Sequence, residues 1–396
     1  MKRFKAWTLT DVHHDIWLDT FAAGSDRLGS AGDWSIRKRT LRGGLREGVD
    51  LIEVDNGALA YSLIPTRGMG LWNGKYRGLP LGWKAPVLGP VHPKFVNLCE
   101  RGGLGWLAGF DEWMVRCGLT HNGPPGEDNY TDRQGRSRRD ILTLHGRIAN
   151  QPAHVVEVRV GLDPPFELSV VGQVEEAALF ASHLHLTSTT TTVPGSNRVV
   201  FHDRIENRGG AAAEMQMLYH CNMGAPFLEA GSRVVAPIRA IAPISKRAAE
   251  GIDTLETYAG PVAGYAEQVY CYDLLSDAAG ATLAMLYNHS ANKGLAMRFQ
   301  RQELPCLTVW KNTASLEDGY VTGLEPATNF PNLKTFERQQ GRVPVIPPGG
   351  HWECTWSIEI HDNLAGVAAV LKEIVSMQAQ AKAIIHRTPQ AIFSPA

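Results

Sequence analysis

Short alternations of apolar and polar residues dominate the chain from residue 49 to about residue 360. The runs are rich in β-branched residues, and turn pairs such as Asn56–Gly57 and Pro194–Gly195 separate them. This pattern is typical of antiparallel strands joined by tight turns. Because it continues over roughly 300 residues, it predicts one large all-β antiparallel sandwich and not two domains. The predicted strands cover residues 51–55, 58–64, 155–160, 166–171, 183–193, 199–207, 281–287, 307–311 and 352–360.

Two segments depart from the strand pattern. Residues 103–129 are rich in Gly, Trp and His, and they are predicted to form a long loop of the kind that often carries function. Residues 363–387 carry apolar side chains at helical spacing, and Asp362 is the expected N-cap. They predict a C-terminal amphipathic helix that packs on the body or on a partner subunit.

The pattern divides the chain into three parts. Residues 1–48 are predicted to form an N-terminal extension packed on the body, with a basic stretch at residues 33–46 that forms either a solvated edge or a subunit contact. Residues 49–361 form the β-sandwich, and residues 362–396 form the C-terminal helix and tail. The first and last parts could make a subunit contact, so a homodimer is expected, and light scattering at micromolar concentration would test it.

Composition excludes several classes of function. The chain has 39 Lys and Arg against 40 Asp and Glu, so no global basic field attracts nucleic acid. No apolar run reaches the roughly 18–20 residues of a membrane helix, and no secretory signal is visible. Six cysteines stand singly and form no CxxC pair, which predicts reduced, mostly buried thiols and a cytoplasmic location.

Three residues are candidates for acid–base chemistry. His220 follows an apolar, strand-like run and is predicted to lie at a strand end, and His145 precedes Gly146 at a turn. Glu325 lies in residues 322–332, which are predicted to form a loop stiffened by proline. A carboxylate and a histidine can both exchange protons near pH 7. Taken alone, each residue is more often structural than catalytic, as a hydrogen-bonded histidine or a carboxylate that accepts backbone N–H groups.

The sequence around these residues resembles the galactose mutarotase-like (aldose 1-epimerase) superfamily over residues 49–361. Four segments follow the order of that family: residues 144–146 (Leu-His-Gly), residues 184–209 with a Pro-Gly-Ser-Asn turn, residues 218–223 (Leu-Tyr-His-Cys-Asn-Met) and residues 323–332 (Gly-Leu-Glu-Pro-Ala-Thr-Asn-Phe-Pro-Asn). The last is followed by Ile-Pro-Pro-Gly-Gly-His-Trp at residues 346–352. The nearest subgroup is a set of uncharacterised bacterial proteins (DUF4432-like), which share residues 65–69 and 82–84.

The resemblance implies a β-supersandwich and an aldose 1-epimerase activity without a cofactor. It implies that Glu325 is the general base, that His220 is the general acid, and that His145 contacts the sugar. The base takes the proton of the anomeric hydroxyl while the acid protonates the ring oxygen, the ring opens, and it closes from the other face. The sequence departs from the family after His220, where Cys-Asn-Met replaces Pro-Tyr-Phe-Asn-Leu, and this leaves the identity of the sugar open.

Further polar residues are candidates for sugar contacts, although each could equally be a surface or structural residue. They are Arg67, Lys84, Asp111, His121, Asn122, Asn222 and Lys311. A concentration of Arg and Lys would suit an acidic sugar. His183 and His185 share one face of a predicted strand with three threonines, which indicates a polar sheet face, and no metal site is expected.

Two other classes of function stay open. The same scaffold could remove a proton next to a carbonyl, as an epimerase, lyase or hydratase of an oxidised or acidic sugar. It could also be a non-catalytic sugar-binding module. A deuterium-exchanged product would indicate the first alternative, and binding without turnover would indicate the second.

Overall fold

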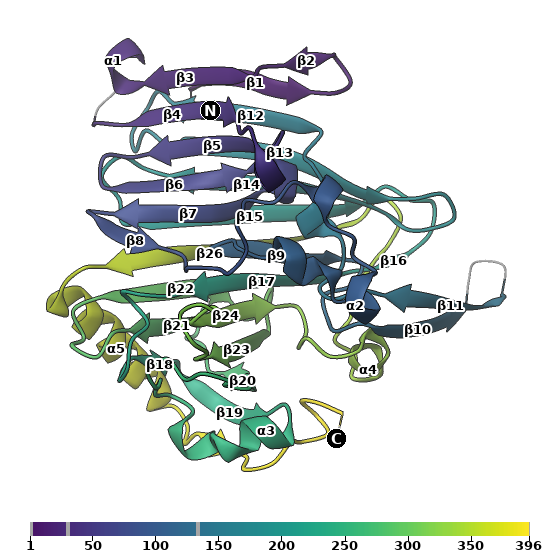
Figure 1. Cartoon of the computed structure of the whole chain (residues 1–396), viewed down its shortest axis with the longest axis vertical. Helices are drawn as coiled ribbons and strands as arrows, with labels where there is room; N and C mark the ends of the chain where they lie inside the picture. Colours follow the sequence, from purple (N-terminus) through teal and green to yellow (C-terminus); the bar gives the residue numbers. More distant parts are fainter. Residues whose placement is uncertain (1–2, 29–31, 132–134, 396) are drawn as a thin grey trace.

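Two large β-sheets form the body of the molecule, and the computed structural model describes residues 3–28, 32–131 and 135–395. The sheets lie one behind the other in Figure 1. The 10-stranded sheet has the order β18 (Arg233–Val235), β21 (Ala281–Tyr287), β22 (Gly294–Gln300), β26 (His351–His361), β15 (Arg198–Asn207), β14 (His183–Thr192), β13 (Leu168–Ala177), β12 (Val155–Gly161), β1 (Phe4–Asp11) and β2 (Ile16–Trp17). Its described pairings are antiparallel.

The 13-stranded sheet carries the candidate site. Its order is β27 (Ile384–Ile385), β19 (Ile238–Pro243), β20 (Gln268–Leu274), β23 (Cys306–Asn312), β24 (Val321–Ala327), β17 (Gln216–Met223), β9 (Met114–Leu119), β7 (Gly70–Tyr76), β6 (Leu59–Ile64), β5 (Asp50–Asp55), β4 (Ser35–Thr40) and β3 (Thr20–Gly24), with β8 (Leu79–Leu81) beside β7. Only the short β27 pairs in parallel, with β19, among the described strands. The predicted all-β sandwich is therefore confirmed.

Smaller elements cover the ends of the sandwich. Two small sheets are made of β10 (Gly126–Thr131) with β11 (Ser137–Leu142) and of β16 (Ala213–Glu214) with β25 (Val345–Ile346). The helices are α1 (Ser25–Leu28), α2 (Glu100–Gly103), α3 (Lys246–Glu250), α4 (Lys334–Gln339) and α5 (Leu364–Gln378). Within the described part of the chain, none of these helices is both long and apolar enough to span a bilayer.

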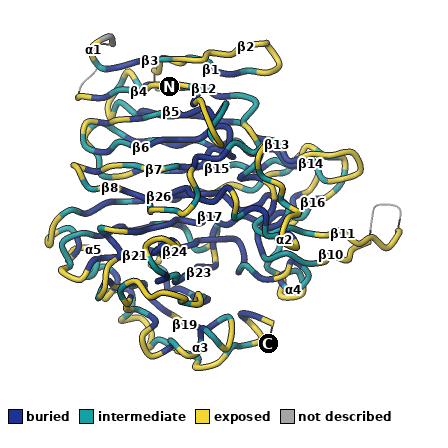
Figure 2. Tube along the Cα trace, viewed as in Figure 1, coloured by how far each residue is buried: buried dark blue, intermediate teal, exposed yellow. Residues whose placement is uncertain are grey.

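The core lies between the two sheets, where alternate residues of both sheets meet. Figure 2 shows buried residues concentrated along the central strands and exposed residues in the peripheral loops. At the centre of the core, Arg116 on β9 reaches Asp203 on β15, with Nε 2.5 Å from Oδ2, and neither side chain is exposed. The hydroxyl of Tyr219 donates to the same carboxylate at 2.9 Å. Because Tyr219 points into the core, strand alternation turns its neighbour His220 to the other face of the sheet.

All nine strands predicted from alternation are present. Eight agree with the predicted bounds within one residue, and β13 extends six residues past its predicted end. The predicted loop at residues 103–129 is wrong over Met114–Leu119, which forms the central strand β9 between β17 and β7. All six residues of β9 are buried, so it has no alternation to detect, and its buried Arg116 resembles a surface residue in the sequence.

Residues near the N-terminus also form strands that were not predicted. β1 pairs with β12 in the 10-stranded sheet, and β3 and β4 extend the 13-stranded sheet beyond β5. The basic stretch at residues 33–46 includes β4, in which Lys38 is buried and lies 3.1 Å from Asp50. The boundary drawn at residue 48 stays a prediction.

The predicted C-terminal helix is confirmed, and it packs on the body. Helix α5 buries Val367, Val370, Ile374 and Met377 against residues of β21 and β22. The predicted N-cap is wrong by one residue, since the Asn363 side chain accepts the N–H of Gly366 at 2.9 Å. The helix ends at Gln378, short of the predicted residue 387.

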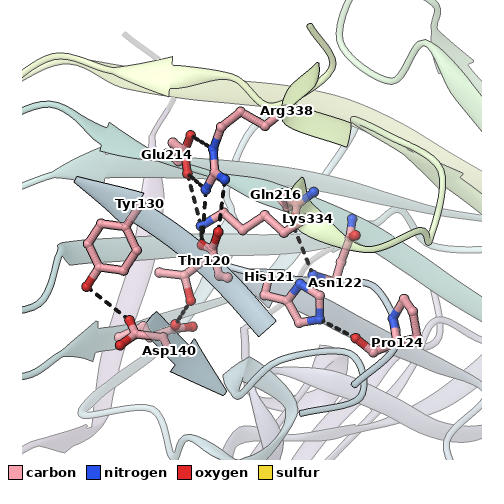
Figure 3. A network of polar contacts seen from close by, with 12 residues as sticks. Thr120, His121, Asn122, Pro124, Tyr130, Asp140, Glu214, Gln216, Lys334 and Arg338 are labelled. Carbon is pink, nitrogen blue, oxygen red and sulfur yellow. Dashed lines mark hydrogen bonds and ion pairs between the residues drawn. The ribbon is translucent and has the colours of Figure 1, made fainter. Parts of the chain in front are cut away.

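A polar network fastens the projecting β10–β11 hairpin to α4 (Figure 3). Arg338 on α4 forms a bidentate contact with Asp128 on β10, with Nη1–Oδ1 at 2.9 Å and Nη2–Oδ2 at 3.0 Å. Its other donors reach Glu214 on β16 at 2.5 and 2.7 Å, and Lys334 lies 3.2 Å from the same carboxylate. The network joins three short elements that have little apolar core of their own.

Candidate active site

Two neighbouring strands bring together the residues predicted to be the acid and the base. His220 on β17 has its Nε2 atom 3.2 Å from Oε1 of Glu325 on β24, and both side chains are almost completely buried. Two of the predicted positions are wrong, because His220 lies within a strand and not at its end, and Glu325 lies in β24 and not in a loop. All residues of both strands are buried, which removes the alternation that marks a strand in sequence.

Asn222 fixes the orientation and the tautomer of His220. Its amide nitrogen donates to the backbone carbonyls of Glu112 at 2.9 Å and His220 at 3.1 Å, so its amide oxygen must face the ring. That oxygen lies 2.6 Å from Nδ1 of His220. Because an amide oxygen only accepts, Nδ1 carries the proton and the Nε2 lone pair is free. Oε1 of Glu325 lies 3.2 Å from Nε2, outside hydrogen-bond geometry.

Burial pushes the Glu325–His220 pair toward its uncharged form. It raises the pKa of the Glu325 carboxyl well above its ordinary value, with a further contribution from the charge of Glu267. Burial, with the nearby His145, lowers the pKa of His220 to about 3. Burial therefore favours the uncharged form of both groups, and transfer of the carboxyl proton to the ring changes no net charge.

His145 approaches the pair from the turn after β11. Its Nδ1 donates to the backbone carbonyl of Asn122 at 2.8 Å, and its ring centre lies 5.5 Å from that of His220. Burial lowers the pKa of His145 to about 4, so the ring is neutral near pH 7, with its Nε2 lone pair turned away from the carbonyl. The residue has a φ of 58°, a left-handed conformation that is uncommon for a residue with a Cβ.

Aromatic rings surround the two histidines. The ring of His220 lies 5.1 Å from Phe110 and 5.4 Å from Trp310, and Trp106 lies 4.7 Å from His145. Such rings offer flat apolar surfaces and exclude water from the proton donor and acceptor. Trp106 and Phe110 were not predicted as site residues, although the loop that holds them was predicted to be functional.

Arg67 and Asp111 lie behind the pair in a buried polar group. The Nε of Arg67 donates to Glu112 at 2.5 Å, and its Nη1 donates to Val91 O at 3.1 Å and to Asn150 at 3.0 Å. Burial, with the charge of Glu112, raises the pKa of Asp111 to about 8. The backbone carbonyl of Glu112 is the one that anchors Asn222. Glu112 was not predicted, and it connects this group to the orientation of His220.

The structure separates the two lysines predicted to bind sugar, and a sugar contact by the exposed Lys84 stays a prediction. Lys311 does not share a face with Trp310, because neighbouring residues of a strand point to opposite sides. Its Nζ donates to the backbone carbonyls of Thr254, Leu255 and Thr257 at 2.7–3.1 Å, so its placement beside the aromatic plane is corrected. Lys84 is exposed. Neither is seen to contact the Glu325–His220 pair in the described part of the chain.

His121 and Asn122 have structural contacts (Figure 3). Nε2 of His121 lies 3.0 Å from the carbonyl of Pro124, and burial lowers the pKa of His121 to about 4. The Asn122 side chain exchanges two hydrogen bonds with Asn329, at 2.9 and 3.0 Å. Asn122 therefore acts on the site through its backbone carbonyl, which orients His145, and a direct sugar contact by either residue stays a prediction.

Comparison with known protein families identifies the family of this chain. The model of a family described as a domain of unknown function, DUF4432, matches residues 46–360. The chain belongs to this family. No curated protein matches it.

Solved structures share the whole fold. A Klebsiella pneumoniae protein described as a "putative aldose 1-epimerase" is 37% identical, with a TM-score of 0.92 over 98% of this chain and 99% of that chain. A galactose mutarotase-like protein from Clostridium acetobutylicum is 15% identical, with a TM-score of 0.56 over 87% of this chain and 99% of that chain. Galactose 1-epimerase from Lactobacillus acidophilus is 10% identical, with a TM-score of 0.51 over 87% and 99% of the two chains. The chain therefore has the galactose mutarotase-like fold, as predicted.

Proposed function

We propose that this protein is an aldose 1-epimerase that interconverts sugar anomers, with Glu325 as general base and His220 as general acid. The observation that carries the proposal is the buried contact of 3.2 Å between Nε2 of His220 and Oε1 of Glu325. The family's likeness to proteins with aldose 1-epimerase names supports it. Lys311 is engaged by three backbone carbonyls, whereas Lys84 is exposed, so the proposal covers neutral and acidic sugars.

The proton held by the pair suits the two transfers of mutarotation. With the proton on His220, the Glu325 carboxylate takes the proton of the anomeric hydroxyl, and Nε2 of His220 protonates the ring oxygen. The C1–O5 bond breaks and the C1–O1 bond becomes a carbonyl. After rotation about C1–C2, His220 takes back the ring-oxygen proton and Glu325 returns its own. Both residues end as they began, and each positioned group contributes about 10²–10⁴-fold.

The test is the rate of exchange between anomeric protons, measured by saturation-exchange NMR across neutral and acidic sugars. We expect the wild-type protein to accelerate exchange for at least one sugar and Glu325→Gln to lose roughly 10²-fold or more. Glu353→Gln removes an exposed carboxylate on the other sheet and is the matched control. Full activity in Glu325→Gln would contradict the mechanism.

The same samples separate the alternative functions. Exchange of a carbon-bound hydrogen of a keto-sugar in deuterated water, without anomer exchange, would indicate an epimerase, lyase or hydratase. Saturable sugar binding without any turnover would indicate a binding module. Either result would replace the proposal.

A further inference from the structure

A second group of histidines lies on the 10-stranded sheet, on the face turned away from the core. His185 on β14 is the direct cross-strand partner of Glu175 on β13. His154 precedes β12, and its backbone N–H donates to Gln173 O on β13 at 2.9 Å. One potential ligand atom from each of His154, Glu175 and His185 lies within 4.8 Å of the others. Three side chains of metal-binding type, from β13, β14 and the residue before β12, therefore lie close to one point.

The cluster has one buried member, His185, and two half-buried ones, and its polar atoms are only partly hydrogen-bonded. The His185 side chain has no exposed surface, and its Nε2 has no hydrogen-bond partner. Glu175 Oε1 lies 3.3 Å from Nδ1 of His185 and 3.3 Å from Nε2 of His183. The Nε2 of His183 is also buried without hydrogen-bond geometry. A buried polar atom without a partner lowers the stability of the fold by about 1–3 kcal/mol, so a ligand that bound these atoms would stabilise the fold.

We propose that His154, Glu175 and His185 bind a divalent transition metal, with His183 as a candidate fourth ligand. Two or three imidazoles with one carboxylate form a donor set that suits Zn²⁺ and related ions of intermediate softness. The site is separate from the Glu325–His220 pair, which lies on the other sheet. Its effect is to tie β12, β13 and β14 together.

The other charged groups around the cluster are compatible with a cation. Arg208 donates to Oε1 of Glu175 at 3.2 Å, and its side chain is 41% exposed. Arg208 also lies 3.5 Å from Glu206, the cross-strand partner of His185, so the guanidinium has a second acceptor when the metal takes Glu175. A ligand carboxylate commonly keeps such an outer hydrogen bond. The ring of His13 lies 5.7 Å from that of His154, and the Asp11 carboxylate also faces His154.

The experiment titrates the purified full-length chain, after treatment with a chelator, with Zn²⁺ alone by calorimetry. Cobalt(II) is then added as a spectroscopic probe of a histidine-containing site. We expect one ion per chain, a raised thermal midpoint with Zn²⁺, and a ligand-field spectrum with Co²⁺. His154→Ala and Glu175→Gln, at half-buried positions, should each weaken binding at least tenfold.

His202→Ala is the matched control. His202 is an exposed histidine on β15, and it lies on the same face of the 10-stranded sheet as the cluster. It should bind Zn²⁺ as the wild type does. The proposal is overturned if the wild type binds no ion, or if His154→Ala and Glu175→Gln bind it as tightly as His202→Ala does. Because the readouts are binding and stability, they are independent of whether the protein is an epimerase.

Discussion

At the scale of single residues, the proposed chemistry depends on Asn222 as much as on the two groups that exchange protons. Asn222 holds Nδ1 of His220 and thereby keeps the Nε2 lone pair free, with Oε1 of Glu325 3.2 Å from Nε2. It is itself held by the backbone of Glu112. An unoriented imidazole would place the proton on either nitrogen and would rotate away from the carboxyl.

Replacing Asn222 with leucine should therefore lower kcat more than it raises KM. The loss of one buried hydrogen bond, of about 1–3 kcal/mol, predicts a fall in kcat of about tenfold to a hundredfold. The measurement is anomer exchange at several sugar concentrations. Asn73→Leu, which removes an exposed amide from β7, should leave kcat unchanged. An unchanged kcat in Asn222→Leu would show that His220 needs no orienting partner.

The sequence identified His220, Glu325 and His145 through their motifs, and the structure brings them together. It did not predict Glu112, because that residue acts through its backbone carbonyl, which leaves no signal in a side-chain pattern. Lys311 was assigned to the site because it is next to Trp310 in sequence, although strand alternation separates them.

At the scale of elements, the network that joins α4 to β10 and β16 should stabilise the projecting hairpin (Figure 3). Asp128 is 4% exposed, and Arg338→Met would leave its carboxylate with only Lys334, 3.6 Å away. Thermal and urea unfolding should show a loss of about 1–3 kcal/mol. Arg387→Met breaks an exposed pair with Asp253 and should cost under about 0.5 kcal/mol. Equal effects of the two substitutions would contradict the argument.

Strands with alternating or β-branched apolar runs were predicted well, even the almost fully buried β21, whereas buried strands that carry polar residues were not. β14 and β15 alternate along their length, and both were found from the sequence. β9, β17 and β24 are buried throughout, and polar residues in them, such as Arg116 and Glu325, imitate loops. The candidate site is built on these three strands, so the sequence located its residues by motif and misjudged the elements that hold them.

At the scale of the whole molecule, buried titratable groups make stability depend on pH in two opposing directions. Burial lowers the pKa of His121, His145 and His185 to about 4 and that of His220 to about 3. In the unfolded chain these groups titrate near 6.5, so unfolding takes up protons below that pH. Asp111, with a pKa of about 8, and Glu325 are raised and act in the opposite direction.

Between about pH 4.5 and 6.5, unfolding takes up more protons at the four histidines than it releases at the two carboxyls. The free energy of unfolding should therefore rise with pH in that window. From about pH 6.5 to 8 the histidines are neutral in both states. Unfolding then releases protons from the two carboxyls, so the free energy of unfolding falls as pH rises. Calorimetric unfolding midpoints should therefore reach a maximum near pH 6.5. A midpoint that rises steadily from pH 5 to 8 would contradict this balance.

Asp111→Asn isolates the alkaline half of that profile. Asn is neutral at every pH and keeps the oxygen that accepts the Trp72 indole N–H at 2.7 Å in the wild type. Because the folded pKa of Asp111 is raised, its contribution is complete below about pH 4 and is lost as pH rises toward about 8. The variant should match the wild type at pH 4 and exceed it by about 1–3 kcal/mol at pH 7, as measured by urea unfolding. Asp15→Asn, at an exposed position, should change neither value. A difference that is the same at both pH values would mean that Asp111 is ionised in the folded protein.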